Sequence, residues 1–362
     1  MGNDIRSRFS RVLLTRMKYI GDVVLTTPLI RSLRSALPGA HLAYMADRHA
    51  ASLLAGNPFL DEIIPYDFSA PAVREQTRVG LGLRRGRFDL VLDLFSNPRS
   101  AQLSWLSGAP VRVGLDRGGR RWLYTLRVQD DGRPKTAVEF HNQFLRAVGI
   151  EPVSVRPELY LLEEERAEIA PRLVEEIFPR ADSPAGPLIA LHAGATWPAK
   201  QWGTSQFAHL AQLLRARLSA RVVITGGPAD ALTLADVVRS AAGSARPAGT
   251  LPLRRLAALL AVCDVAVCND GGPMHIAAAL GTPTIGLFGP GEEQIWFPYD
   301  RADGHRALRK HVPCHPCHLD VCTRQGEEKM ECMKLLTVYD VFSAVEAALS
   351  RGARTEHGRP AR

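Results

Sequence analysis

The sequence predicts an α/β protein that consists of two doubly wound domains. Apolar strand segments alternate with amphipathic helices in both halves, and 362 residues exceed what one hydrophobic core usually spans. The segment 179–187, PRADSPAGP, has the proline, serine and glycine content of a linker. We therefore expect an N-terminal domain over residues 1–180 and a C-terminal domain over residues 187–336.

The first half begins with an apolar strand over residues 11–16, RVLLTR. Leucines then recur every fourth residue, which is the spacing of one helical face, at Leu25, Leu29, Leu33 and Leu37. Strands follow over residues 41–47 and 88–94, and an acidic helix over 163–178 precedes the linker. This order favours a parallel sheet with right-handed crossovers.

The second half repeats the pattern after the linker. Strands are predicted over 187–194, 220–227, 264–270 and 282–289, and helices over 205–218, 230–242, 252–263 and 273–280. We expect a final helix over residues 337–350 to pack back on the N-terminal domain, and residues 352–362 to be a disordered tail. Parallel sheets of this type bind ligands at the carboxyl ends of their strands, so functional residues should lie at the corners between strand and helix.

The composition is that of a soluble globular protein, with 46% hydrophobic and 23% charged residues. No run approaches the ~18 apolar residues of a membrane-spanning helix. The first ten residues lack the apolar stretch of a secretion signal. We expect a cytoplasmic protein, and six cysteines in a chain of this length do not indicate a secreted disulfide scaffold.

The net charge of +8 comes entirely from the first half of the chain. Residues 1–160 contain 23 Lys and Arg against 15 Asp and Glu, whereas residues 161–362 contain 22 of each. The excess is either a soluble face with many arginines or an attraction for an anionic partner, such as a phosphorylated substrate or a membrane surface. We expect no nucleic-acid partner, because the arginines are dispersed and no recognition motif accompanies them.

A lone carboxylate, Asp22, lies where the first predicted strand meets its helix. Two roles fit this position. Asp22 can cap the helix, since a carboxylate accepts backbone N–H bonds there and suits the positive end of the helix dipole. Alternatively, it lies at the mouth of a cleft and takes part in chemistry.

The segment 269–283, NDGGPMHIAAALGTP, follows a strand of the second half. Gly271 and Gly272, after Asp270, allow close approach of the backbone, and the next residue is a proline suited to a first helical turn. The N–H groups of such a turn form an anion site, with His275 within reach of a bound diphosphate or sugar. The structural alternative is a tight turn with His275 as a satisfied surface residue.

Two further corners carry polar side chains. In HAGATWPAKQWG (192–203), Thr196 offers a hydroxyl and Lys200 a point charge, which together suit a phosphate. Lys200 alone is more often a solvated loop lysine, but two corners on neighbouring strands strengthen the phosphate interpretation. In TGGPAD (225–230), Asp230 either binds a ribose hydroxyl or caps the next helix.

Four late cysteines, Cys314, Cys317, Cys322 and Cys332, have the spacing C-x2-C-x4-C-x9-C. In a reducing compartment, clustered cysteines bind a metal more often than they form disulfides. Two interpretations follow: a structural metal, zinc before an iron–sulfur cluster, or thiols that stabilise a surface subdomain without a metal. Cys263 and Cys268 flank an apolar strand and are interpreted as core residues.

Four segments also resemble, in order, the signature segments of the ADP-heptose–lipopolysaccharide heptosyltransferases of glycosyltransferase family nine. They are KYIGDVVLTTPLIRSLR, HAGATWPAKQWGTSQFAHL, CNDGGPMHIAAALGTPTIGLFGP and the late cysteine group. The likeness covers about residues 11–350. It implies a GT-B fold of two facing Rossmann-like domains, with donor nucleotide bound in the second and acceptor in the first.

The resemblance also implies an activity and the residues that carry it. The family transfers heptose with inversion from ADP-heptose to an anionic glycolipid, the lipopolysaccharide inner core, at the cytoplasmic face of the inner membrane, and no metal is required for the transfer. Its general base falls on Asp22. Its diphosphate contacts fall on Thr196, Lys200 and the corner from Asp270 to His275, with Asp270 near the sugar. One departure is Gly291, where many members have threonine after Gly-Pro.

Other functions remain compatible with the same residues. A nucleotide-sugar epimerase or hydrolase of this architecture would turn over its substrate without any acceptor. A transferase of another nucleotide sugar would serve a different polysaccharide. A nucleotide- or metal-sensing module built around the cysteines would bind its ligand without turnover.

Overall fold

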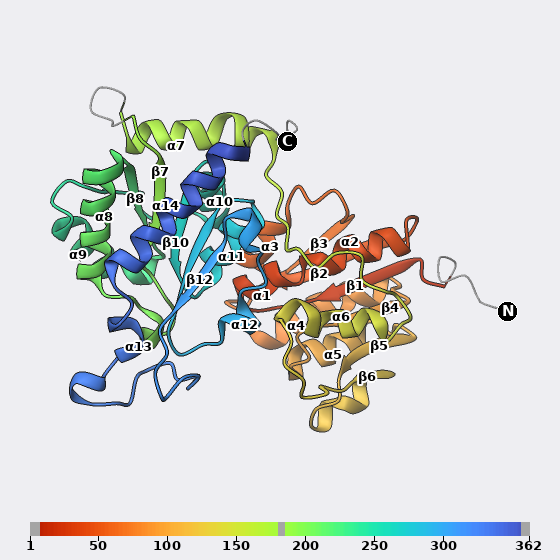
Figure 1. The fold of residues 1–362 in the computed structure, drawn as a ribbon. Coiled ribbons are helices and arrows are strands. Elements are labelled where there is room, and N and C mark those ends of the chain that lie inside the picture. The colour runs from red at the N-terminus through yellow and green to blue at the C-terminus, as the bar shows by residue number, and fades with distance from the viewer. Residues whose placement is uncertain (1–7, 180–184, 356–362) are drawn as a thin grey trace. The chain divides into compact units, whose positions relative to one another are not determined.

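The structure, a computed structural model, describes residues 8–179 and 185–355. The chain forms two compact units that divide between Tyr160 and Leu161. Each unit contains one parallel six-stranded sheet with helices packed against it (Figure 1). The predicted α/β fold class is confirmed in both halves.

The first unit has the strand order β3-β2-β1-β4-β5-β6, and all its neighbouring strands are parallel. This is the doubly wound order in which the chain reverses direction between β1 and β4. The strands are β1 (Arg11–Thr15), β2 (His41–Asp47), β3 (Glu62–Tyr66), β4 (Leu90–Asp93), β5 (Val111–Leu115) and β6 (Leu126–Val128).

Apolar runs without alternation explain why the central strands are buried on both faces. Successive side chains of a strand point to opposite faces, so Val12 and Leu14 of β1 enter one core cluster and Leu13 enters the other. Leu42 and Ala43 of β2 are divided between the same two clusters. The helices of this unit are α1 (Ile20–Leu25), α2 (Thr27–Ala36), α3 (Arg48–Ala51), η2 (Ser52–Leu54), α4 (Ala72–Arg85), α5 (Pro98–Leu106), η3 (Gly119–Leu123) and α6 (Ala137–Arg146).

The second unit repeats the same topology, with the order β12-β11-β10-β7-β8-β9 and parallel neighbours throughout. Its direction reverses between β7 and β10. The strands are β7 (Leu188–His192), β8 (Arg221–Thr225), β9 (Arg246–Pro247), β10 (Val265–Asn269), β11 (Thr284–Phe288) and β12 (Arg306–Arg309). Cys263 and Cys268 are buried at the ends of β10, as the sequence predicts, and burial raises the pKa of the Cys268 thiol to about 12.

The helices of the second unit include the long α8 and α14, which pack against each other. The helical segments are η4 (Glu165–Ile169), α7 (Ala170–Ile177), η6 (Pro198–Lys200), α8 (Thr204–Leu218), η7 (Pro228–Asp230), α9 (Ala231–Ser240), α10 (Leu253–Ala261), α11 (Gly272–Ala279), α12 (Glu293–Trp296), η8 (Arg301–Asp303), η9 (Gly326–Glu328), α13 (Glu331–Lys334) and α14 (Val338–Thr355).

The division between the units lies earlier than the expected boundary at residues 180–187. The acidic helix α7 packs on α10, and Glu165 forms an ion pair with Arg254 of that helix. Arg246 also stacks over the ring of Phe178. These contacts attach residues 161–178 to the second unit, whereas part of the expected linker, residues 180–184, lies outside the described residues.

Helix α14, which the sequence predicts to pack back on the N-terminal domain, packs within the second unit. Its Val341, Phe342 and Val345 lie in the core of the second unit, and the helix contacts α8, β10, β11 and β12 (Figure 1). The helix also continues to Thr355, so residues 352–355 are helical and not part of a tail. The remaining expected tail, residues 356–362, lies outside the described residues.

Within residues 8–179 and 185–355, no helix combines the length and the apolar character that crossing a bilayer requires.

Candidate active site

The second unit gathers its candidate residues at the point where its strand order reverses. Strands β7 and β10 are neighbours in the sheet, and they end at His192 and Asn269. Doubly wound sheets bind ligands at such a strand reversal, outside the carboxyl ends of the strands. Both motifs that the sequence analysis selected, 192–203 and 269–283, begin at this place.

Asn269 joins the two loops. Its side-chain Nδ2 donates to the carbonyl oxygens of Ala193 and Gly194 at 3.0 and 3.3 Å, and its Oδ1 accepts the N–H of Trp202 at 3.0 Å. The side chain is buried, so each of its hydrogen bonds replaces one lost to water. Asn269 therefore fixes the position of the loop after β7 relative to the loop after β10.

Lys200 and Asp270 form a buried ion pair across this corner. Lys200 Nζ lies 2.6 Å from Asp270 Oδ2, and the two side chains are 19% and 4% exposed. Lys200 Nζ also lies 4.6 Å from the ring centroid of Trp197. A Cβ at Gly291 would come within 2.8 Å of Asp270 Oδ2, so a larger residue there would require that carboxylate to shift. Lys200 is thus ion-paired and mostly buried, and not the solvated loop lysine of the alternative interpretation.

Helix α11 begins directly beside the Lys200–Asp270 pair. Gly271 precedes it in an extended conformation, and a Cβ on Gly271 would find no atom nearer than Asn269 O at 3.9 Å. Gly272 and the following residues open the helix, and N–H groups of a first turn have no acceptor within the helix. These N–H groups and the Lys200 ammonium form a region suited to an anion.

His275 is buried in the first turns of α11, with 3% of its surface exposed. Its Nδ1 lies 2.9 Å from the hydroxyl of Tyr299. Burial raises the pKa of Tyr299 well above its ordinary value, so that hydroxyl stays protonated and is suited to donate to the imidazole. His275 is thus not the surface residue of the structural alternative.

The remaining two candidates lie at neighbouring corners. Thr196 is exposed in the loop after β7. Asp230, after β8, accepts the N–H of Gly227 at 2.8 Å through Oδ2. Its carboxylate lies directly against Gly194, where any Cβ would collide with it. Asp230 therefore stabilises its own turn and packs the loop after β8 against the loop after β7.

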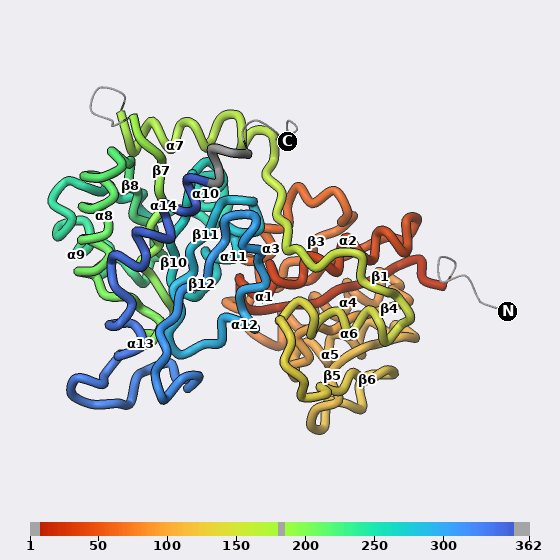
Figure 2. Tube along the Cα trace, in the orientation of Figure 1, coloured from red at the N-terminus to blue at the C-terminus, as the bar shows by residue number. Residues whose placement is uncertain are grey.

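The cysteine-bearing segment, residues 314–332, forms hydrogen bonds with two of these loops. The backbone N–H of Ala199 donates to Asp320 O at 2.9 Å. His315 Nε2 lies 2.9 Å from Gly291 O, and the N–H of His318 donates to Pro290 O at 3.1 Å. Figure 2 traces this segment from β12 to α13. It holds both the Lys200 loop and the Gly291 loop.

The four cysteines of the segment lie near one another. Burial, reinforced by the other three thiols, raises the pKa of Cys332 to about 11. Cys322 Sγ accepts the N–H of Met330 at 3.3 Å. Among the described residues, no group of three or more His, Cys, Asp or Glu side chains is disposed to hold a metal ion. The expected metal site at Cys314, Cys317, Cys322 and Cys332 is therefore not supported.

The strand order of the first unit reverses between β1 and β4, and Asp22 lies in the loop and helix that follow β1. Arg16 follows β1, and its Nη2 lies 2.5 Å from Asp22 Oδ1. The same guanidinium donates to Leu94 O at 3.2 Å and lies 5.0 Å from the ring centroid of Phe95. Both of these partners follow β4, so Arg16 fixes Asp22 relative to the two central strand ends. The Asp22 side chain remains 13% exposed.

Asp22 also performs the capping role. Its Oδ2 accepts the backbone N–H of Tyr19 at 3.1 Å, at the start of α1. One carboxylate oxygen thus contacts Arg16 and the other the backbone. The capping interpretation is confirmed, and it does not exclude a second role for the same carboxylate.

Two buried titratable groups, His141 and Asp93, lie in the first unit near these strand ends. Burial and the nearby Arg16 cation lower the pKa of His141 to about 3, so its imidazole is neutral, and its Nδ1 lies 2.7 Å from Ala137 O. At the end of β4, burial raises the pKa of Asp93, which accepts hydrogen bonds from the Tyr124 hydroxyl at 2.7 Å and the Ser96 N–H at 2.9 Å. Asp93 is fully buried and supports the strand end.

Sequence reasoning missed the partners that orient these residues. Arg16 lies six residues before Asp22 and directly after the apolar strand. An arginine at the end of a buried strand needs a partner, and this was an available signal. Asn269 precedes Asp270 within the motif itself. Tyr299 lies in a loop after α12 without any local pattern, and only the fold brings it to His275.

Comparison with known proteins agrees with this geometry. The model of "Glycosyltransferase family 9 (heptosyltransferase)" matches residues 76–327, which is more than half of the chain. Lipopolysaccharide heptosyltransferase 1 of Pseudomonas aeruginosa is 29% identical over 337 residues, covering 88% of this chain and 89% of that protein.

Two solved structures resemble the whole chain. The family 9 glycosyltransferase of Veillonella parvula superposes with a TM-score of 0.82 at 25% identity, over 96% of this chain and 99% of that one. The ADP-heptose lps heptosyltransferase II of Escherichia coli gives 0.77 at 25% identity, over 95% and 99%. The chain belongs to glycosyltransferase family 9, the heptosyltransferase family, and is an enzyme of that class.

Proposed function

We propose that this protein transfers heptose from ADP-heptose to the inner core of lipopolysaccharide, with inversion at the anomeric carbon. The observation that carries the proposal is the Lys200–Asp270 pair beside the start of α11, at the strand reversal of the second unit. A cation, a carboxylate and helical N–H groups at one corner match a diphosphate linked to a sugar. The names of the relatives support heptose as that sugar.

The second unit would bind the donor. Lys200, Thr196 and the N–H groups at Gly271 and Gly272 would contact the diphosphate, with Asp270 toward the sugar hydroxyls. Asp230, at the next corner, would contact the ribose. As the glycosidic bond breaks, negative charge develops on the departing ADP, and preorganised N–H groups and an ammonium stabilise it without reorganisation.

The first unit would supply the base. The attacking hydroxyl of the acceptor must lose its proton as the new bond forms, and Asp22 would accept it. Arg16 holds the Asp22 carboxylate in a fixed position beside the ends of β1 and β4, which favours a defined direction of proton transfer. His141 would stay neutral and add no charge beside the base.

The direct test supplies a panel of nucleotide sugars with lipopolysaccharides truncated at different inner-core positions. We expect ADP-heptose alone to be consumed, with a glycolipid product of opposite anomeric configuration to the donor. We further propose that Lys200 and α11 take the place of a divalent cation, so the rate should persist in EDTA. Transfer from a different nucleotide sugar, or ADP release without a glycolipid product, would overturn the assignment.

A further inference from the structure

Neighbouring helices of the first unit leave large apolar side chains in contact with solvent. Helix α5 contacts both α4 and η3. Among the exposed large apolar residues, these three elements contribute Val73, Leu81, Trp105, Leu106 and Trp122. The two tryptophans are 56% and 66% exposed. Exposed apolar groups that gather on adjacent elements mark interaction sites, whereas isolated ones do not.

The same three helices are strongly basic. They contain seven arginines, and Glu75 is their one acidic residue. Glu75 is buried and accepts hydrogen bonds from Arg78, so it adds no accessible negative charge. Within the part of the chain that the structure describes, the side chains of Arg74, Arg84 and Arg85 of α4 form no ion pair or hydrogen bond. Much of the positive excess of the first half is therefore exposed here.

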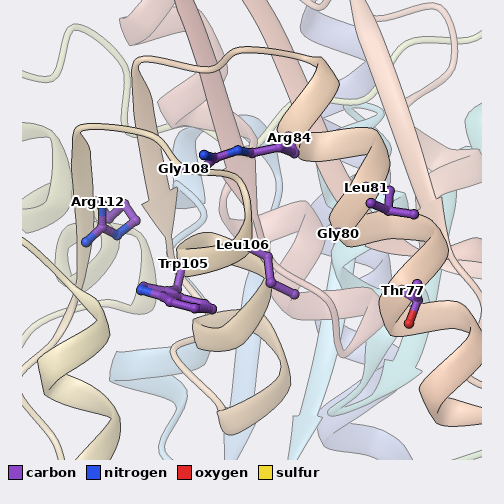
Figure 3. A pocket seen from close by; sticks show the side chains of 8 residues that line it. All are labelled: Thr77, Gly80, Leu81, Arg84, Trp105, Leu106, Gly108 and Arg112. Carbon is purple, nitrogen blue, oxygen red and sulfur yellow. The ribbon is translucent and has the colours of Figure 1, made fainter.

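The apolar and basic side chains of α4 share one side of the helix. At 100° per residue, Val73, Arg74, Leu81, Arg84 and Arg85 fall within an arc of roughly 120°. Between α4 and α5 lies a pocket of about 560 Å³, lined by Leu81, Arg84, Trp105 and Leu106, among others (Figure 3). The Arg84 guanidinium reaches over Gly108 at its edge. We name this surface, Val73, Arg74, Leu81, Arg84, Arg85, Trp105 and Leu106, the α4–α5 face.

We propose that the α4–α5 face docks on the surface of an anionic lipid bilayer. Tryptophan is enriched at the boundary between headgroups and acyl chains, and arginine can lay its stem on apolar groups while its guanidinium reaches phosphate. Each arginine close to an anionic surface strengthens binding about fivefold. Since the side chains of Arg74, Arg84 and Arg85 form no ion pair with a carboxylate, a densely anionic plane complements them better than a protein surface of mixed charge does.

This inference deepens the proposed function, on which it rests for a membrane-held acceptor. A glycolipid acceptor is confined to a bilayer, so an enzyme that docks there searches for it in two dimensions. The α4–α5 face would supply that attachment and would contact lipid headgroups, not the reacting hydroxyl. None of its residues belongs to the candidate active site described above.

Vesicle flotation of the full chain tests the proposal directly. We expect binding to vesicles of phosphatidylcholine with one-quarter phosphatidylglycerol, no binding to phosphatidylcholine alone, and at least tenfold weaker binding in 500 mM than in 50 mM salt. Leu81→Ser with Trp105→Ala should weaken binding at least tenfold, and so should Arg74→Gln with Arg84→Gln and Arg85→Gln. A matched control, Leu232→Ser with Arg215→Gln, changes an exposed leucine and an exposed arginine of the second unit and should leave binding unchanged.

Three results would overturn the proposal. They are absence of binding to anionic vesicles, undiminished binding by both α4–α5 variants that remain folded by circular dichroism, and a concentration-dependent oligomer that these variants abolish while vesicles are not bound. The last result would identify the face as a contact between protein chains.

A second pair of assays separates this inference from the proposed function. The α4–α5 variants should transfer sugar at the wild-type rate to a deacylated, water-soluble acceptor but more slowly to the glycolipid in vesicles. If the wild type transfers to neither acceptor while vesicle binding behaves as expected, the proposed function fails and the docking surface stands. Equal loss on both acceptors would count against docking.

Discussion

At the scale of single residues, the candidate carboxylates are each fixed by one basic side chain. Asp22 pairs with Arg16 at the strand reversal of the first unit, and Asp270 pairs with Lys200 at that of the second. The sequence predicted both acids and Lys200, because each lies in a motif at the end of an apolar strand. It could not predict the pairs, which depend on loops whose contacts are set by the sheet order.

Asp22→Asn separates the base from the cap. Asparagine keeps an oxygen that can accept the Tyr19 N–H, so α1 should stay capped and the protein folded. General-base catalysis contributes about 10²–10⁴-fold, so we expect kcat to fall by about that factor in steady-state assays while ADP-heptose affinity stays within a few fold.

The matched control for this variant is Asp47→Asn. Asp47 also ends a strand of the first unit and accepts a helical N–H, that of His49, at 3.0 Å. Its substitution should leave kcat unchanged. Near wild-type turnover by Asp22→Asn would show that Asp22 is only a cap.

Lys200 and Asp270 are expected to affect ADP binding in opposite directions. A charge-assisted phosphate contact contributes about 1.5–3 kcal/mol, so Lys200→Met should raise the ADP dissociation constant roughly 10- to 150-fold. Asp270→Asn removes a negative charge 2.6 Å from Lys200 Nζ, so ADP should bind it more tightly, although transfer slows. Isothermal titration with ADP measures both.

The alternative for this pair is purely structural. If Lys200 only neutralises the buried Asp270, each single substitution should lower the unfolding temperature and leave ADP affinity unchanged. That outcome would remove Lys200 from the donor site.

At the scale of elements, strands with continuous apolar runs were predictable and those without were not. Strands β1, β2, β4, β7, β8, β10 and β11 coincide with predicted segments within a few residues. Strand β3, EIIPY, contains a proline and is half-exposed at the sheet edge, and β6 has only three residues with an arginine among them. Their pairing comes from tertiary contacts that local sequence does not encode.

The cysteine-bearing segment also has contacts that local sequence does not predict. Its spacing predicted a metal site, whereas its visible role is to brace the Lys200 and Gly291 loops through backbone and His315 contacts. Backbone acceptors leave no signature in a sequence. The cysteine motif therefore marked an important segment, and the metal site that its spacing predicts stays a prediction.

His315→Phe tests the brace. It keeps a planar aromatic ring, somewhat larger than imidazole, and removes the hydrogen bond to Gly291 O, which is worth about 1 kcal/mol. With the Gly291 loop loosened beside Asp270, we expect the KM for ADP-heptose to rise several fold, the KM for the acceptor to stay constant, and kcat to change less.

The control is His318→Ala in the same segment. The His318 ring makes an exposed pair with Glu292 at 3.3 Å, worth little in water, while its backbone bond to Pro290 O survives the change. Equal effects of the two variants on donor KM would argue against a specific role of His315.

At the scale of the whole molecule, the two-unit α/β plan was predictable because both halves repeat the same alternation of apolar strands and amphipathic helices. The position of the division was not. Composition marked residues 179–187, but the Glu165–Arg254 pair and the packing of α7 on α10 attach the preceding helix to the second unit. Such contacts join residues about ninety positions apart, beyond the reach of any local pattern.

Each unit also contains a buried histidine with a lowered pKa, which makes stability depend on pH. Burial and the Arg16 cation lower the pKa of His141 to about 3. Burial lowers the pKa of His192 to about 4, against a weaker opposing effect of Asp230. Unfolding frees both rings to protonate near their ordinary pKa of about 6.5. Their contribution is thus complete above about pH 6.5 and is lost as pH falls toward 4, by up to about 1.4 kcal/mol per pH unit for each ring.

Thermal unfolding between pH 7 and pH 4.5 should therefore show a falling midpoint. His192→Asn should make that fall shallower, since one titrating ring is gone. His209→Asn, an exposed histidine on α8, is the control and should leave the slope unchanged. A midpoint independent of pH over this range would contradict the assignment of buried neutral histidines.

The central claim is that the enzyme moves a heptose onto a glycolipid and does not merely cleave or rearrange its donor. Mass spectrometry of a heptose-deficient lipopolysaccharide after incubation with ADP-heptose tests it most directly, with ADP release measured in the same sample. We predict one added heptose unit per glycolipid in a one-to-one ratio with ADP, and negligible ADP without acceptor. ADP or altered nucleotide sugar at the same rate with and without the glycolipid, whose mass stays unchanged, would contradict the account.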